Sequence, residues 1–176
     1  MWAVLENPLP RAPTGGVNTN QGERPEMNVR WIQAAALGAA FLVAQSAQAA
    51  PRVIKIVGTD DMKYSVMKID AKPGEEIKIV LTGQGALPKE SMAHNFVLLA
   101  PGVNLDEFSM QAIMARATNY VPKNAGDKIL ASTGLAGAGE TVEVTFKAPT
   151  APGTYTYICT FPGHYAAGMK GILTVK

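Results

Sequence analysis

Residues 155–171 read YTYICTFPGHYAAGMKG, and this stretch carries most of the chemical information in the chain. It places a thiol, an imidazole and a thioether at Cys159, His164 and Met169, a C-x4-H-x4-M spacing. Period-two alternation predicts a strand that ends at the cysteine, with the cysteine on its inward face. Pro162 and Gly163 predict a turn that brings the imidazole back toward the thiol. We therefore expect a loop on which three side chains that bind metals converge.

The other nitrogen ligand has to come from residues 91–99, SMAHNFVLL, because the chain has only two histidines and His94 is the other one. A soft thiolate with two imidazoles and a weak thioether is the donor set of blue copper electron-transfer sites. Zinc would prefer a harder fourth ligand or a second thiolate. We expect one copper ion that cycles between Cu(I) and Cu(II), held by His94, Cys159, His164 and Met169.

Strand patterns fill the chain on either side of these segments. Residues 77–82 and 141–147 alternate apolar and polar side chains, so each predicts a strand with one buried face. Further strand-like runs span residues 53–57, 63–70, 95–99, 128–132, 154–159 and 171–176. About eight short strands separated by turns predict an all-β fold, an antiparallel Greek-key β-sandwich.

One segment has a helical pattern. Asn104 can cap a helix with Glu107 at its third position, and Leu105, Phe108, Ala112 and Ala115 follow at helical spacing. This predicts one short helical flap inserted into the sandwich. Four methionines are expected to pack in the core or under the flap, or else to bind Cu(I) weakly; they are Met62, Met67, Met110 and Met114.

The segments Met92–Leu98 and Cys159–Gly171 resemble those of azurin-type cupredoxins, which are blue copper proteins, and the loop spacing is most similar to that of auracyanin. The resemblance covers residues 51–176. It implies copper bonds from Nδ1 of His94 and His164, a short bond to the Cys159 sulfur and a distant axial Met169. It also implies that Asn95 ties the two ligand loops together, and that the backbone amides of Asn95 and Phe161 donate to the sulfur and adjust its potential.

Two departures from azurin limit the resemblance. Azurins usually carry glycine before the first histidine, and its carbonyl makes a weak fifth contact, whereas this chain has Ala93. The resemblance therefore does not carry over a fifth ligand. Cys159 is also the only cysteine, so the azurin disulfide is absent.

Apolar and aromatic residues flank the predicted ligands: Met92, Phe161, Pro162 and Tyr165. In the resembled family, an apolar surface around the second histidine is where redox donor and acceptor proteins dock. The sequence leaves open whether Met92 and Phe161 line such a surface or simply pack.

The N-terminal part predicts export. Residues 27–49 have a positive start at Arg30, an apolar run of about eleven residues and Ala47-Gln48-Ala49, the pattern of a secretory signal cleaved after Ala49. That run is too short to span a bilayer, which takes about twenty residues. We interpret residues 1–26 as a disordered extension from a misassigned start, residues 27–49 as the signal and residues 50–176 as the copper domain, soluble in the periplasm or outside the cell and not integral to a membrane.

The remaining composition narrows the function. The 16 basic and 14 acidic residues give a net charge of +2, which is too weak and too dispersed to favour nucleic acid as a partner. No histidine remains for a catalytic copper, and no second cysteine for a binuclear centre. We therefore expect an electron carrier and not an enzyme, with a protein that stores or delivers copper as the competing hypothesis.

Overall fold

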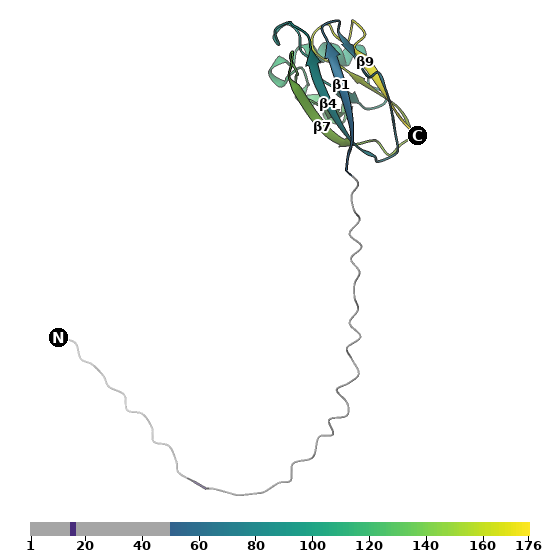
Figure 1. The fold of residues 1–176 in the computed structure, drawn as a ribbon. Helices are drawn as coiled ribbons and strands as arrows, with labels where there is room; N and C mark the ends of the chain where they lie inside the picture. Colours follow the sequence, from purple (N-terminus) through teal and green to yellow (C-terminus); the bar gives the residue numbers. More distant parts are fainter. Residues whose placement is uncertain (1–14, 17–49) are drawn as a thin grey trace, which may run out of the picture. The chain divides into compact units, whose positions relative to one another are not determined.

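The structure is a computed structural model, and it describes residues 15–16 and 50–176. The predicted extension (1–26, apart from Gly15 and Gly16) and the predicted signal (27–49) lie outside the described residues. Within residues 50–176, nine strands form two facing sheets (Figure 1). The first sheet has the order β2-β1-β4-β7, and the second has the order β3-β9-β8-β5-β6. The strands are β1 (Arg52–Thr59), β2 (Lys63–Tyr64), β3 (Lys68–Ala71), β4 (Glu76–Gln84), β5 (Val97–Leu99), β6 (Ile129–Ser132), β7 (Thr141–Lys147), β8 (Gly153–Ile158) and β9 (Lys170–Val175).

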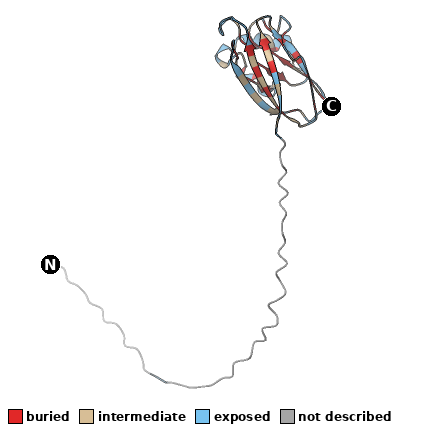
Figure 2. Cartoon of the chain, viewed as in Figure 1, coloured by how far each residue is buried: buried red, intermediate tan, exposed pale blue. Residues whose placement is uncertain are grey.

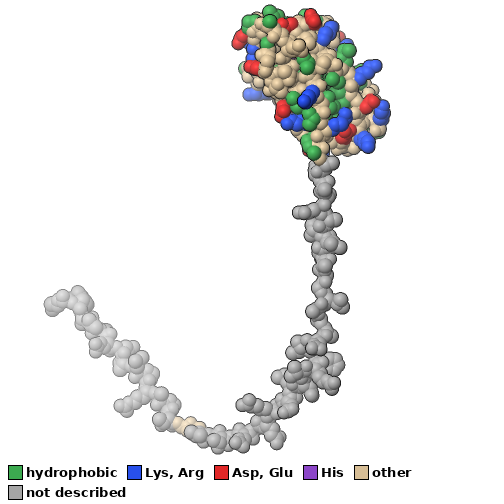
Figure 3. All heavy atoms as spheres, viewed as in Figure 1, with side chains coloured by type: hydrophobic (Ala, Val, Ile, Leu, Met, Phe, Trp, Pro, Cys, Tyr) green, Lys and Arg blue, Asp and Glu red, His purple; other side chains and the backbone are tan. Residues whose placement is uncertain are grey.

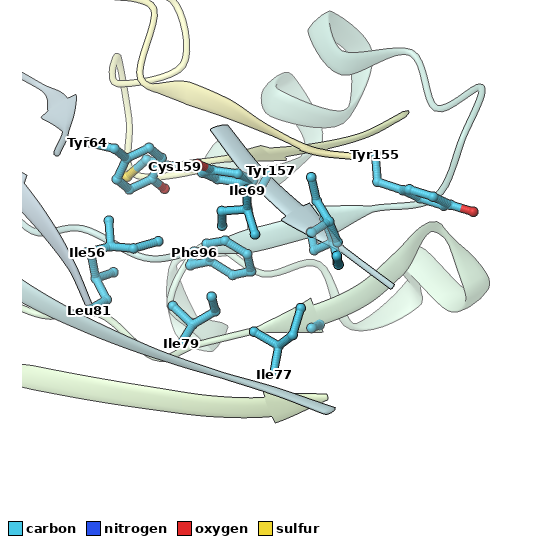
Figure 4. Packing of buried hydrophobic residues seen from close by; sticks show 14 of the residues in the cluster. Ile56, Tyr64, Ile69, Ile77, Ile79, Leu81, Phe96, Tyr155, Tyr157 and Cys159 are labelled. Carbon is cyan, nitrogen blue, oxygen red and sulfur yellow. The ribbon is translucent and has the colours of Figure 1, made fainter. Parts of the chain in front are cut away.

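The alternating side chains of the strands form the core between the two sheets. In β4, Ile77, Ile79 and Leu81 are fully buried and the intervening residues are only half-buried (Figure 2). From the other sheet, Tyr155 and Tyr157 of β8 belong to the same buried cluster (Figure 4). Full burial of one large apolar side chain contributes about 1.5–3 kcal/mol to folding, so this core can hold the sandwich together without a metal. The predicted β-sandwich is confirmed.

Both sheets are mixed, however, rather than purely antiparallel. β1 runs parallel to β4 (Figure 1), with Ile56 opposite Leu81, and β3 runs parallel to β9. The physical reason is the path of the chain. It reverses direction between β1 and β2, crosses to the other sheet as β3, and reverses once more before it returns as β4. The two reversals leave β4 running in the same direction as β1.

The crossing also divides a run that the sequence pattern presents as one strand, residues 63–70. Tyr64 pairs with Gly58 in the first sheet, and Lys68 pairs with Ile172 in the second. The chain leaves one sheet at Ser65 and joins the other at Lys68, so β2 is only two residues long.

The predicted helical flap is α1 (Leu105–Ile113), between β5 and β6, followed by short 3-10 helices at Arg116–Thr118 and Lys123–Lys128. Asn104 Oδ1 accepts the backbone N–H groups of Asp106 and Glu107, each at 3.1 Å, so the predicted cap is in place. The Glu107 carboxylate instead accepts a bond from Gln111 Nε2, so the reciprocal half of the capping box is not made. Phe108 is buried and attaches α1 to the second sheet.

The methionines differ from the expectation that they pack. Met67, Met110 and Met114 are 56%, 67% and 85% exposed, and only Met62 is partly buried among the core residues. Met110 lies on the side of α1 away from the buried Phe108, and Met114 follows it by one turn, so helix geometry puts both thioethers in solvent. On the face of the domain drawn in Figure 3, acidic and basic side chains are interspersed, in keeping with a small net charge.

Candidate metal centre

Three buried side chains converge at one end of the sandwich. His94 Nδ1 or Nε2, the Cys159 sulfur and a ring nitrogen of His164 all lie within 4.8 Å of one another. Their residues are at most 2% exposed. His94 precedes β5, Cys159 follows β8, and His164 lies on the loop from β8 to β9. The structure thus brings together the three predicted ligands that carry thiol and imidazole groups.

The backbone and ring of His94 are both fixed. Its N–H donates to the Ala136 carbonyl at 2.9 Å, and the Ala136 N–H donates back to the His94 carbonyl at 2.8 Å. The imidazole lies against Gly58 of β1, where an added Cβ would come within 2.6 Å of the ring's Cγ. Because Gly58 has no side chain, the ring can lie against the strand in this position.

The loop of residues 159–169 is closed by its own hydrogen bonds. The Cys159 N–H donates to the Met169 carbonyl at 3.1 Å, and the Met169 N–H donates to the His164 carbonyl at 2.9 Å. Gly163 and Gly168 have φ of 85° and 87°, a region that favours glycine. The turn predicted at Pro162-Gly163 is therefore present, and backbone hydrogen bonds within the loop fix the positions of its side chains.

Asn95 connects the two segments that carry the histidines. Its Oδ1 accepts the Thr160 N–H at 2.8 Å, and its Nδ2 donates to Thr160 Oγ1 at 2.8 Å and to the Asn119 carbonyl at 3.1 Å. The bond between loops that the resemblance implied for Asn95 is thus present, and Thr160 is the residue on the other side.

Burial controls the protonation of the three side chains. It raises the pKa of Cys159 to about 11, against the opposing effect of the backbone N–H groups of Asn95 and Phe161 and of the Tyr64 hydroxyl. It lowers the pKa of His164 to about 4, with a smaller contribution from the charge of His94. The pKa of His94 is lowered by burial too, although Asp60 opposes the shift. Near neutral pH both imidazoles are uncharged, as a metal ligand must be, and the thiol carries the one proton that a metal would displace.

An orphaned nitrogen shows that this donor set suits a cation. Among the described residues, His94 Nδ1 is the only buried side-chain nitrogen or oxygen without a hydrogen-bond partner. Buried polar atoms are normally paired, so an unpaired one needs an explanation such as a missing ion. The Cys159 sulfur lies 3.4 Å from His164 Nδ1, so the His164 nitrogen that is expected to bind copper faces the thiol.

Met169, the fourth predicted ligand, is fully buried in the same cluster as Cys159. Its backbone is bonded to both Cys159 and His164, as described above. The structure therefore places Met169 next to the converging side chains.

The apolar and aromatic residues that flank the predicted ligands differ in exposure and in contacts. Met92, Pro162 and Tyr165 are partly exposed, whereas Phe161 is buried, with its ring centroid 4.8 Å from that of His164. Tyr165 leans toward the helix, where its hydroxyl donates to Asp106 at 2.9 Å. Phe161 therefore packs against the imidazole, and Tyr165 joins the loop to α1.

Two residues of the site were missed in the sequence, Gly58 and Tyr64. Tyr64 is buried beside Cys159 (Figure 4), and its hydroxyl donates to the Asn95 carbonyl. Residues 63–66 alternate polar side chains with Tyr64 and Val66, which predicts that Tyr64 points inward. A hydroxyl that is buried in this way must make a hydrogen bond, so it signals a specific contact. Gly58 inside a strand pattern is likewise a signal of close approach by another group.

A sandwich that holds one buried thiol and two buried imidazoles at the same end defines a class, the cupredoxins with a mononuclear copper centre. Residues 52–176 match the family model described as copper binding proteins, plastocyanin/azurin family. The chain belongs to the plastocyanin/azurin family of copper-binding proteins. It is an electron-transfer protein with one blue copper ion.

Individual relatives agree with this assignment. The chain is 37% identical over 130 residues to an azurin of Pseudomonas fluorescens biotype A, a match that covers 70% of this chain and 97% of the azurin. It is 49% identical over 86 residues to auracyanin-B of Chloroflexus aurantiacus, which covers 47% of this chain but only 35% of auracyanin-B. The solved structure of auracyanin A from Chloroflexus aurantiacus, titled a "blue" copper protein, superposes with a TM-score of 0.64 at 34% identity, over 72% of this chain and all of that one.

Proposed function

We propose that His94, Cys159 and His164 bind the copper ion and that Met169 is a weak axial fourth ligand. The observation that carries the proposal is the convergence of three buried side chains, one of which, His94, has a ring nitrogen, Nδ1, without a hydrogen-bond partner. Thiolate, two imidazoles and a distant thioether form the ligand set of blue copper sites. When bound, copper supplies the one-electron couple and the blue colour that comes from charge transfer with the thiolate.

The protein's own contribution is a site that changes little between oxidation states. The His94 backbone is paired on both sides with Ala136, and the loop of residues 159–169 is closed on itself. Because these backbone bonds fix the segments that carry the ligands, the ligands need little rearrangement when an electron arrives or leaves. Burial keeps water from the donor atoms.

We propose the same supporting role for Asn95 and Phe161 that the family implies. Their backbone N–H groups lower the pKa of Cys159, as expected when N–H groups point at the sulfur. A donor to the sulfur stabilises its negative charge, and this adjusts the potential without touching the metal.

We further propose that the protein is a carrier and not an enzyme. The sequence holds only two histidines, and both belong to the proposed site. A catalytic copper would need imidazoles of its own. Electrons would enter and leave through partner proteins that dock at the apolar surface around His164, which includes the partly exposed Met92 and Pro162.

Export completes the proposal: residues 27–49 act as a removable signal, and residues 50–176 form the exported copper domain. The family match and β1 both begin at residue 52, which supports a domain boundary just before it. Among the described residues, no helix is long and apolar enough to cross a membrane. N-terminal sequencing of the protein recovered from the periplasm should begin at Ala50, and a mature protein that retains residues 27–49 would contradict the proposal.

The binding experiment is a copper titration of the metal-free protein, followed by visible absorption. We expect one copper per chain and an intense blue band that bleaches reversibly on reduction. Cys159→Ser should abolish the band and keep the far-UV circular dichroism of the folded sandwich, because the core is apolar and does not depend on the metal. Copper bound without a blue band, or released without redox cycling, would favour a storage or delivery protein.

A further inference from the structure

The two-residue strand β2 contacts both loops that carry the proposed ligands. Lys63 Nζ donates to the Ala167 carbonyl at 2.9 Å, on the loop that bears His164. The Tyr64 hydroxyl donates to the Asn95 carbonyl, beside His94. Ser65 anchors this segment to β1: its N–H donates to the Val57 carbonyl at 2.9 Å, and its Oγ accepts the Val57 N–H at 2.8 Å. β2 is thus a fixed point from which both loops are held.

Tyr64 is the inward residue of this strand. It is 4% exposed, and its ring lies 5.6 Å from that of Tyr157, centroid to centroid. In Figure 4 its side chain lies next to Cys159. A buried hydroxyl is costly unless it makes hydrogen bonds, and a phenylalanine would fill the same space without that requirement. The hydroxyl therefore needs a function that the ring alone does not have.

The acceptor of the Tyr64 hydroxyl is a residue that is held at every polar atom. The side chain of Asn95 is bonded to Thr160 and Asn119, and its backbone N–H acts on the Cys159 sulfur. The hydroxyl adds the remaining contact, at the backbone carbonyl. Removing it would leave a buried carbonyl without this partner, at the residue that joins the two loops.

We propose that Tyr64 is a positioning residue for electron transfer, and this rests on the copper site proposed above: its hydroxyl holds the Asn95 carbonyl and so keeps the Asn95 backbone N–H in place beside the Cys159 sulfur. A hydroxyl has only one proton to donate. The Asn95 carbonyl accepts that proton, so the hydroxyl acts on the sulfur through the position of the Asn95 backbone. The sulfur carries more negative charge in the reduced site, so an Asn95 N–H that is held beside the sulfur stabilises the reduced state and raises the reduction potential.

The pKa shifts of Cys159 and Tyr64 are consistent with a hydrogen-bond donor that stabilises the reduced site. Burial raises the pKa of Cys159 to about 11, and the backbone N–H of Asn95 opposes this rise, which is the effect of a donor on a thiolate. Burial holds the pKa of Tyr64 well above its usual range, and Cys159 raises it further, so the hydroxyl keeps its proton.

The test compares Tyr64→Phe with Tyr157→Phe in the full chain. Tyr157 is the matched control because it lies in the same cluster, but its hydroxyl donates to the Val66 carbonyl at 2.7 Å. Voltammetry of the copper-loaded proteins gives the potential, and amide hydrogen exchange of the metal-free proteins reports on the Asn95–Thr160 connection. We expect Tyr64→Phe to shift the redox equilibrium toward the oxidised form by about three- to tenfold, a tenfold shift being about 59 mV for one electron. It should also speed amide exchange at Thr160, and Tyr157→Phe should do neither.

Several outcomes would overturn the proposal. One is an unchanged potential in Tyr64→Phe, and another is an equal shift in both variants. If Tyr64→Phe does not fold, 3-fluorotyrosine at position 64 keeps the ring and strengthens the donor, so the potential should rise; no rise would overturn the proposal as well. Failure of the unmodified protein to form a blue copper site would overturn the proposed function itself, which separates that result from a failure specific to Tyr64.

Discussion

Met169 is the predicted ligand whose removal distinguishes a redox role from a packing role. It is fully buried, like the core residue Leu173 on β9. A weak axial thioether gives some electron density to the oxidised site, so Met169→Leu should keep the blue band and raise the potential, and Met169→Gln, with a harder oxygen donor, should lower it. A tenfold change in the redox equilibrium corresponds to about 59 mV.

The control for Met169 is Leu173→Ala, which should destabilise the protein by about 2–5 kcal/mol with little change in potential. Voltammetry and thermal unfolding on the same samples separate the two roles. If neither Met169 variant moves the potential, Met169 is a core residue and not the axial ligand.

His164 makes the stability of the metal-free protein depend on pH. Its pKa is about 4 in the folded state and near the usual 6.5 when unfolded, so between these values the unfolded chain binds more protons. The free energy of unfolding should therefore fall as pH drops from 6.5 toward 4, by about 1–3 kcal/mol from this residue.

Urea unfolding of the metal-free protein between pH 5 and 6.5 measures this effect. His164→Gln should flatten the dependence, because glutamine does not titrate. Equal slopes in the two proteins over that interval would show that His164 is not buried as a neutral imidazole.

At the scale of elements, β1 sets the position of His94 through Gly58. An added Cβ would overlap the imidazole at 2.6 Å and would also come within 2.9 Å of the His94 Cβ, so the histidine has to move. We expect Gly58→Ala to weaken copper binding at least about tenfold, or about 1.4 kcal/mol, and to alter the blue band. Copper titration followed by absorption measures both.

Gly134→Ala is the matched control for Gly58→Ala. An added Cβ there meets only Val142 Cγ1, at 4.0 Å. It should leave copper affinity and spectrum unchanged. A wild-type spectrum and affinity in Gly58→Ala would contradict the view that this glycine positions the ring.

Some of the secondary-structure elements could be predicted from the sequence and others could not. The strand at residues 141–147 and the helix capped by Asn104 could be predicted because their patterns are local. The division of residues 63–70 between the sheets could not be predicted, because it depends on which distant strand each half pairs with.

The residues of the site also fall into those that the sequence predicts and those that it does not. Cys159, His164 and Met169 lie on one short loop, and His94 followed by elimination. Gly58 and Tyr64 act through contacts with residues more than thirty positions away, and periodicity in one sequence does not report such contacts.

For the whole molecule, the net charge of +2 is too small to steer a partner protein strongly. We therefore expect the rate of electron exchange to depend mainly on the proposed apolar docking surface. A charge placed at a docking patch costs association energy and does not touch the copper ligands. Met92→Glu should therefore slow electron exchange with the natural partner about tenfold and leave the spectrum unchanged.

Val53→Glu provides the control for Met92→Glu. Val53 is an exposed apolar residue at the start of β1, whereas Gly58, near the other end of that strand, packs on His94. The Val53→Glu substitution introduces the same charge as Met92→Glu and should leave the rate of electron exchange unchanged. Equal rates in both variants and the unmodified protein, measured by stopped-flow absorption, would remove Met92 from the docking surface.

The most direct test of the copper assignment is anomalous diffraction at the copper absorption edge from crystals of the loaded protein. We expect a single strong peak within bonding distance of His94 Nδ1, the Cys159 sulfur and His164 Nδ1. A peak at the exposed thioethers of Met110 and Met114, or no peak between the two histidines, would contradict it.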